Sequence, residues 1–77
     1  MISACVLVRC RPGKYKEVVA DSRKLSHVAN AYNVFGRWDV IIEIQAPSMP
    51  DVDNTTTSIN TMTGVRSIET LIEKPLS

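Results

Sequence analysis

The pattern of hydrophobic and polar positions divides the chain into four extended segments and two helical ones. Residues 2–10 (ISACVLVRC) are apolar at almost every position, which is typical of a strand covered on both faces. Alternation places Ala4, Val6 and Val8 on one face and Cys5 and Leu7 on the other. Pro12-Gly13 ends this strand. Beyond it, an amphipathic helix of about three turns is predicted by the helical spacing of Tyr15, Val18, Val19, Ser22 and Leu25.

The middle of the chain predicts a β-hairpin. Two apolar runs, Val28–Phe35 and Val40–Ala46, flank the polar tetrapeptide Gly36-Arg37-Trp38-Asp39. A turn that only reverses the chain favours small residues such as Asn-Gly, so these bulkier side chains indicate a function. The face of the second strand that is expected to meet the helices carries Val40, Ile42 and Ile44.

A second helix follows the hairpin. Ser48 and Asp51 have the spacing of a capping box, with Pro50 in the first turn, so we expect a helix from there to about Met62. Gly64 suits a left-handed cap at its C-terminal end. The apolar stripe of this helix consists of Val52, Thr55 or Thr56, Ile59 and Met62.

The last strand is predicted over Val65–Glu73, followed by a short tail, Lys74–Ser77. Alternation groups Val65 with Ser67, Glu69 and Leu71 on one face of it. The order β-α-β-β-α-β with right-handed crossovers gives a ferredoxin-like sandwich of the α+β class, with two helices on one face of a four-stranded antiparallel sheet. The other face carries Cys5, Leu7, Ile41 and Leu71. We infer that another subunit covers it; a solvated, moderately apolar sheet is the alternative.

Length and composition describe one small domain, residues 1–77, with 44% hydrophobic residues. Domains near this length bury only about 60% of the surface that the unfolded chain exposes, so association often adds stability. Cys5 and Cys10 lie roughly 16 Å apart on opposite faces of one strand, too far for a disulfide. Their spacing matches no zinc or redox motif, and we expect neither a metal nor a cofactor.

Charge and hydropathy narrow the possible partners. The net charge is +1 and the nine Lys and Arg residues are scattered along the sequence, so no direct nucleic-acid partner is expected. No apolar stretch approaches the roughly 18 residues of a membrane-spanning helix, and the first ten residues lack the features of a signal peptide. We expect a soluble, cytoplasmic protein with no membrane partner.

The turn residues offer the groups that hold a small zwitterion. Gly36 allows positive φ and exposes a backbone N–H, and Arg37 can pair with a carboxylate. Asp39 can accept an ammonium, and Trp38 can form an apolar or cation–π wall. The alternative is structural. In that case Asp39 bonds the turn backbone, Arg37 is solvated and Trp38 anchors a subunit contact.

Three further residues bear on a site. Tyr32, just before the turn, is a candidate ligand contact, with core packing as the alternative. Thr70, in the last strand, is a candidate of the same kind. His27 lies between the first helix and the hairpin, where the sequence places no nucleophile or carboxylate beside it, so a solvated loop residue is expected.

Five motifs occur in order along nearly the whole chain: Ala4-Cys-Val-Leu-Val, Pro12-Gly13, Tyr32-x-Val-x-Gly36-x-x-Asp39, Gly64-Val65 and Thr70. Together they resemble the effector-binding domain of the Lrp/AsnC (leucine-responsive, feast/famine) transcriptional regulators. Those regulators normally carry an N-terminal helix-turn-helix domain. Because the first strand here begins at residue 2, the chain resembles a stand-alone version without a DNA reader of its own.

The resemblance implies a dimer of two sheets packed face to face, a ring of eight or ten subunits, and an amino acid bound where dimers meet. It carries a ligand-binding role to Gly36 and Asp39 as motif matches, to Arg37 and Trp38 by position, and to Tyr32 and Thr70 as lining or supporting residues. Two positions depart from the family pattern. Ile68 stands where many relatives have a second hydroxyl, and Arg37-Trp38 is bulkier and more basic than the common acidic–aromatic pair.

We therefore expect an oligomeric, amino-acid-binding module that modulates transcription by ligand sensing or by association with full-length Lrp/AsnC regulators. A purely structural oligomer and a dimeric α/β-barrel enzyme are the alternatives, although the strands offer the enzyme mostly aliphatic side chains. RNA binding would require exposed aromatics in the first and third strands, which have none. Acyl phosphate hydrolysis would require a phosphate-cradling loop, and Arg11-Pro12-Gly13 offers too few free N–H groups.

Overall fold

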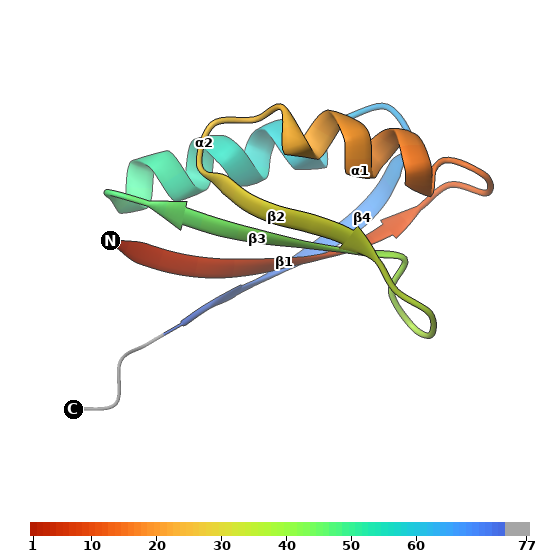
Figure 1. Ribbon diagram of the computed structural model, residues 1–77, viewed down its shortest axis with the longest axis horizontal. Coiled ribbons are helices and arrows are strands. Elements are labelled where there is room, and N and C mark those ends of the chain that lie inside the picture. Colours follow the sequence, from red (N-terminus) through yellow and green to blue (C-terminus); the bar gives the residue numbers. More distant parts are fainter. Residues whose placement is uncertain (74–77) are drawn as a thin grey trace.

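The computed structural model describes residues 1–73 and confirms the predicted order of elements (Figure 1). The strands are β1 (Ile2–Cys10), β2 (Val28–Asn33), β3 (Val40–Ala46) and β4 (Val65–Ile72). The helices are α1 (Tyr15–Arg23) and α2 (Met49–Asn60). The short tail predicted for residues 74–77 lies outside the described residues.

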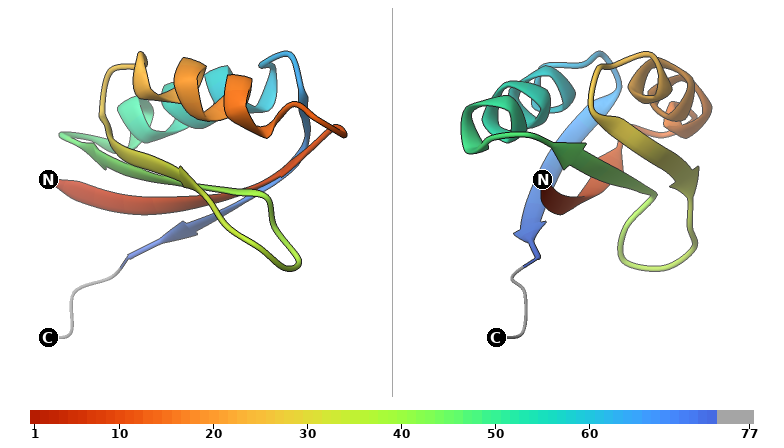
Figure 2. Two further views of the ribbon diagram at one scale, coloured as in Figure 1. Left: turned by 45° about the vertical axis from the view of Figure 1, so that its right-hand side comes forward. Right: turned by 60° about the vertical axis from the view of Figure 1, so that its left-hand side comes forward.

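The four strands form one antiparallel sheet in the order β2-β3-β1-β4. Both helices pack on the same face of this sheet, and no element within residues 1–73 covers the other face (Figures 1 and 2). The predicted ferredoxin-like sandwich is therefore confirmed. The sequence of β1 indicated a strand covered on both sides, whereas within the described chain it is covered on one side only.

The hydrophobic core lies between the helices and the sheet. The inward faces predicted for β1 and β3 are confirmed, because alternate side chains of both strands point toward the helices. Full burial of one such aliphatic side chain contributes about 1.5–3 kcal/mol. The largest buried apolar side chains, all under 2% exposed, are Val6, Val8, Val40, Ile42 and Ile44 of the sheet, Val18 of α1, and Val52 and Ile59 of α2.

Helix α2 begins with the capping arrangement predicted at Ser48. Its backbone is extended there (φ −147°, ψ 163°), and Oγ accepts the N–H of Asp51 at 3.4 Å while donating to the Asp51 carboxylate at 2.9 Å. The buried hydroxyl of Thr55 donates to the carbonyl of Asp51 at 2.8 Å, so this threonine-rich helix satisfies that hydroxyl internally. The helix ends at Asn60, slightly before the predicted end near Met62.

Helix α1 is shorter than the pattern predicted. It ends at Arg23, because the next two N–H groups bond three residues back rather than four, which tightens the chain into a turn. Leu25 therefore packs against the core from the following loop. Tyr15, predicted to lie on the apolar stripe, is 39% exposed at the first position of the helix.

A β-bulge changes the alternation expected in β4. The register of β1 with β4 shifts between Arg9 and Cys10, which gives β4 one extra residue. The bulge turns Val65 toward the helices, where it is 8% exposed. The sequence pattern grouped Val65 with Leu71 on the opposite face, and that grouping is wrong.

The connection between α2 and β4 depends on Gly64. Its φ is +93°, and a Cβ at this position would lie 2.9 Å from the Cβ of Lys14, at the start of α1. Its carbonyl accepts the N–H of Arg11 at 2.8 Å. The predicted left-handed conformation is present, but it lies in the connection, since the C-cap of α2 is Thr61.

We expect Gly64→Ala to destabilise the domain by about 2–4 kcal/mol in urea unfolding, because left-handed strain and steric overlap add. The matched control is Gly13→Ala. Gly13 also has positive φ (+76°), but no atom lies within 4 Å of the added Cβ, so only the conformational cost of about 1–2 kcal/mol is expected. Equal losses for the two variants would show that the approach to Lys14 is not a constraint.

Candidate functional site at the hairpin turn and the open sheet face

The hairpin turn is longer than predicted and spans residues 34–39. Strand β2 ends at Asn33, and the N–H of Val34 donates to the carbonyl of Asp39 at 2.9 Å, which closes the loop. Phe35, predicted to end the strand, instead lies in this loop and is 99% exposed. The loop projects from the sheet on the side away from the helices (Figures 1 and 2).

Asp39 ties the turn to the neighbouring strand β1. Its N–H donates to the carbonyl of Val8 at 2.8 Å, and its Oδ2 accepts the N–H of Cys10 at 2.8 Å. The carboxylate thus bonds backbone, as the structural alternative expected, but the backbone is that of β1 and not of the turn. Within residues 1–73, Oδ1 has no hydrogen-bond partner, so it remains available to an ammonium.

The other turn residues divide into anchored and free ones. The guanidinium carbon of Arg9 lies 5.4 Å from the centroid of the Trp38 ring, and this cation–π contact holds the indole beside β1. Gly36 has a φ of +122° with open space around it. Arg37 is exposed and, in the part of the chain that the structure describes, makes no hydrogen bond or ion pair. Trp38 and Asp39 therefore fix the turn, whereas Arg37 is free to contact a ligand.

Tyr32 and Thr70 lie on opposite faces of the sheet. Tyr32 is half-buried opposite Ile41, on the open face. Thr70 is half-buried opposite Val6, on the face that the helices cover. Because β1 and β3 separate β4 from β2, a single chain does not bring Thr70 to the turn.

A small hollow beside the turn contains residues that the sequence analysis missed. Its volume is about 140 Å³, and it is lined by Tyr15, Asn33, Val34, Phe35 and Asp39. Tyr15 comes from the start of α1, so its proximity follows from tertiary packing and has no local signal. Phe35 has a local signal, because it is an aromatic residue directly before Gly36, where turns favour small or polar residues.

The open face of the sheet has the apolar centre predicted from the sequence. Cys5 lies opposite Leu71, and Leu7 lies opposite Ile41. Leu71 is 53% exposed, and the other three are half-buried. The apolar side chains thus form one connected area over the three strands β3, β1 and β4 that no described element covers.

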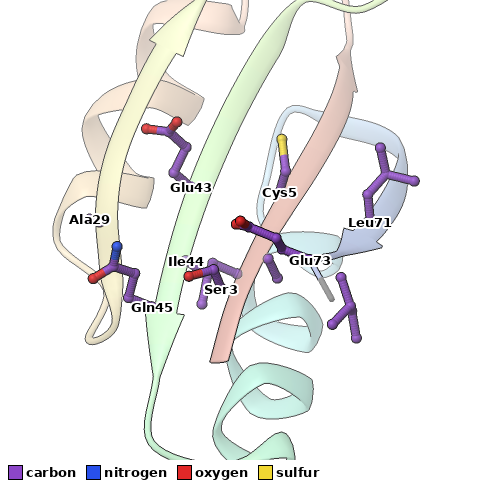
Figure 3. A pocket seen from close by; sticks show the side chains of 10 residues that line it. Ser3, Cys5, Ala29, Glu43, Ile44, Gln45, Leu71 and Glu73 are labelled. Carbon is purple, nitrogen blue, oxygen red and sulfur yellow. The ribbon is translucent and has the colours of Figure 1, made fainter. Parts of the chain in front are cut away.

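One end of this open face is hollowed. The hollow has a volume of about 300 Å³, and Figure 3 shows Glu43 and Gln45 of β3 beside Ser3 and Cys5 of β1 on its floor. Polar groups therefore surround the apolar centre at this end of the sheet.

Both cysteines are free thiols. Burial raises the pKa of Cys5, and the nearby Glu43 carboxylate raises it further. Burial, followed by the charge of Asp39, raises the pKa of Cys10 to about 11. The thiolate is the nucleophilic form, so the raised pKa of each side chain disfavours its reactivity near neutral pH.

No group of three or more His, Cys, Asp or Glu side chains in residues 1–73 could hold a metal ion. No helix in that range is long and apolar enough to cross a membrane.

Residues 3–73 match the family model described as the Lrp/AsnC ligand binding domain. The chain belongs to this family. Since the family is a ligand-binding domain of transcription regulators and not an enzyme family, the Lrp/AsnC assignment excludes the dimeric-barrel enzyme considered above.

Known Lrp/AsnC relatives agree with the assignment. The HTH-type transcriptional regulator FL11 of Pyrococcus horikoshii is 28% identical over 69 residues, which cover 90% of this chain and 46% of that protein. The chain therefore spans about half the length of the curated relatives that it matches.

Solved structures show the same fold. The protein TTHA0845 from Thermus thermophilus is 28% identical, with a TM-score of 0.92, covering 100% of this chain and 98% of that one. The transcriptional regulator NMB0573 from Neisseria meningitidis, solved as a complex with L-Met, is 18% identical, with a TM-score of 0.81, covering 96% of this chain and 50% of that one. At that identity the second likeness concerns the fold alone.

We expect Asp39→Ala to destabilise the domain by about 1.5–3 kcal/mol, because it removes a charged acceptor and leaves the N–H of Cys10 unpaired. Arg37→Ala, two residues away on the exposed tip, is the control and should change the free energy of unfolding by no more than about 0.5 kcal/mol. Urea unfolding of the two variants measures both changes in the free energy of unfolding. An Asp39→Ala variant as stable as the parent chain would contradict the anchoring role.

Proposed function

We propose that this domain binds a free amino acid at the hairpin turn, dimerises through its open sheet face, and assembles further into a ring of eight or ten subunits. In this proposal the bound amino acid changes the assembly or its partners, and full-length Lrp/AsnC regulators are those partners. A partner of DNA-bound regulators works where the DNA is, so the proposal places the domain in the cytoplasm.

Ligand binding at the turn is supported chiefly by the unpaired guanidinium of Arg37, on a turn that contacts with β1 hold in place. Arg37 is exposed in the same turn that contributes Val34, Phe35 and Asp39 to the hollow, while Asp39 and the Arg9–Trp38 contact fix the backbone of this turn. A guanidinium binds a carboxylate through two parallel hydrogen bonds, and Oδ1 of Asp39 can accept an ammonium. Phe35 offers an apolar wall to the ligand's side chain.

The remaining predicted residues fit this proposal if neighbouring subunits complete the site. Tyr32 lies opposite Ile41 on the open face, where a second subunit would meet it. Thr70 lies away from the turn of its own chain, so it can contribute only across a subunit contact. The match of residues 3–73 to a ligand binding domain supports a small molecule as the ligand class.

The dimer is supported by the uncovered apolar centre of the sheet. Connected apolar areas of this kind mark association sites in small proteins. A second copy that covered Leu7, Ile41 and Leu71 would leave β1 buried on both faces. This explains why β1 has the continuous apolar sequence of a doubly covered strand.

A ligand bound where dimers meet can regulate assembly by mass action. It stabilises whichever assembly contains the complete site, by an amount that grows with its concentration relative to its dissociation constant. The regulatory output is then a change in the population of rings, or in their association with full-length relatives.

A purely structural oligomer is the second candidate. It is favoured by the same contacts that anchor the turn, since the Cys10 N–H bond to Asp39 and the Arg9 contact to Trp38 give both side chains a role without a ligand. The two candidates differ in what Arg37 does.

The test is thermal unfolding in the presence of each of the twenty amino acids. Ligand at a hundred times its dissociation constant stabilises by about 2.7 kcal/mol, which should raise the Tm of a domain of this size by roughly 10 °C or more. We expect one amino acid, or one class of them, to give this rise, and Arg37→Ala to abolish it without lowering the Tm of the free domain.

The control is Arg66→Ala, which removes an exposed guanidinium from β4 and should leave the rise intact. A rise that survives Arg37→Ala would move the ligand away from the turn. If no amino acid raises the Tm, the structural oligomer becomes the better account.

A further inference from the structure

A separate hollow lies on the helix side of the molecule, away from both the turn and the open face. It has a volume of about 330 Å³ and is lined by residues 25–27 of the α1–β2 connection and by Asp51, Asn54, Thr55 and Ser58 of α2. Figures 1 and 2 show this connection passing beside α2. The volume is within the range of small-molecule sites, and most of the lining side chains are polar.

His27 lines this hollow with its backbone in a strained, left-handed conformation. Its φ is +72°, and it is the only residue other than glycine with positive φ within residues 1–73. The conformation is fixed from β3, because the N–H of Gln45 donates to the carbonyl of His27 at 2.9 Å. Glycine would adopt this conformation without strain, whereas an L side chain costs about 1–2 kcal/mol. The imidazole is thus held there although the backbone alone would favour glycine.

The imidazole faces a carboxylate without bonding to it. Nε2 of His27 lies 3.9 Å from Oδ1 of Asp51, beyond hydrogen-bond distance, and both side chains are about one-third exposed. The other carboxylate oxygen of Asp51 is occupied, because it accepts the Ser48 hydroxyl at 2.9 Å. When the imidazole carries its proton on Nδ1, Nε2 and Oδ1 are two acceptors 3.9 Å apart on residues that line the hollow.

We propose that this hollow is a second binding site, for the primary ammonium group of a small organic amine. An ammonium has three N–H donors, so it can donate to Nε2 of His27 and Oδ1 of Asp51 together and direct the third to the Asn54 amide oxygen. The carbon chain of the amine then lies over Leu25 and the methyl group of Thr55.

Other ligand classes fit the hollow less well. An anion would meet the carboxylate of Asp51. A metal ion would have only His27 and Asp51 as ligands, and no group of three ligating side chains is found within residues 1–73. The ammonium group is common to diamines and to free amino acids, so the probes must separate these two sources.

The experiment follows the imidazole directly by NMR. The chain has a single histidine, so its ring signals need no assignment among several. Putrescine and a panel of amino acids at millimolar concentrations are titrated into the full chain. We expect saturable shifts of the His27 ring signals, and the same shifts in Arg37→Ala, because this site does not depend on the turn. Shifts with putrescine only, or with amino acids only, identify the source.

Variants test the two acceptors. His27→Gly relieves the strained backbone, so its Tm should be unchanged or higher while putrescine or amino-acid affinity, measured by calorimetry, falls at least tenfold. Asp51→Asn should weaken binding similarly. Asp53→Asn is the matched control, because it removes a neighbouring carboxylate of α2 that does not line the hollow. Absence of any ring shift at saturating amine, parent-like affinity in His27→Gly, or equal weakening by Asp53→Asn would overturn the proposal.

Discussion

Both helices pack on the same face of the sheet, and the rest of the structure depends on this one-sided packing. In β1 and β3, every second residue faces α1 and α2 and is buried. The residues between them form a second apolar area, which no element of the described chain covers. A domain this small buries a limited fraction of its surface on folding, so burial of the open face by association would add substantially to its stability. Fold and association are therefore two results of one sequence pattern.

The turn illustrates how stability and recognition are divided among neighbouring residues. Asp39 accepts a backbone hydrogen bond from β1 and Trp38 contacts Arg9 of that strand, and both hold the loop, whereas Arg37 and Phe35 are exposed. A turn that is already held by contacts with β1 loses little conformational entropy when a ligand binds to its exposed side chains. The hollow at His27 lies on the helix side of the sheet, so the two candidate sites can bind different ligands independently.

The order of elements, the inward faces of β1 and β3 and the cap at Ser48 could be predicted because periodicity and capping are local properties of the sequence. Contacts between distant segments could not. The exposed guanidinium of Arg23, at the end of α1, donates to the carbonyl of Ala31 on the edge strand β2 at 2.8 and 3.1 Å. The proximity of His27 to Asp51 and of Tyr15 to the turn likewise follows from how the helices pack, for which single residues carry no signal.

Solution scattering tests directly whether a second copy covers the open sheet face. A single chain has a Cα radius of gyration of 11.8 Å and a mass of 8.5 kDa. Cover of this face by a second copy predicts a mass at least twice this value, with a correspondingly larger radius, for the parent chain at micromolar concentration, and a return to the single-chain values for Leu7→Asp. A parent chain that scatters as a monomer, or a Leu7→Asp variant of unchanged mass, would contradict it.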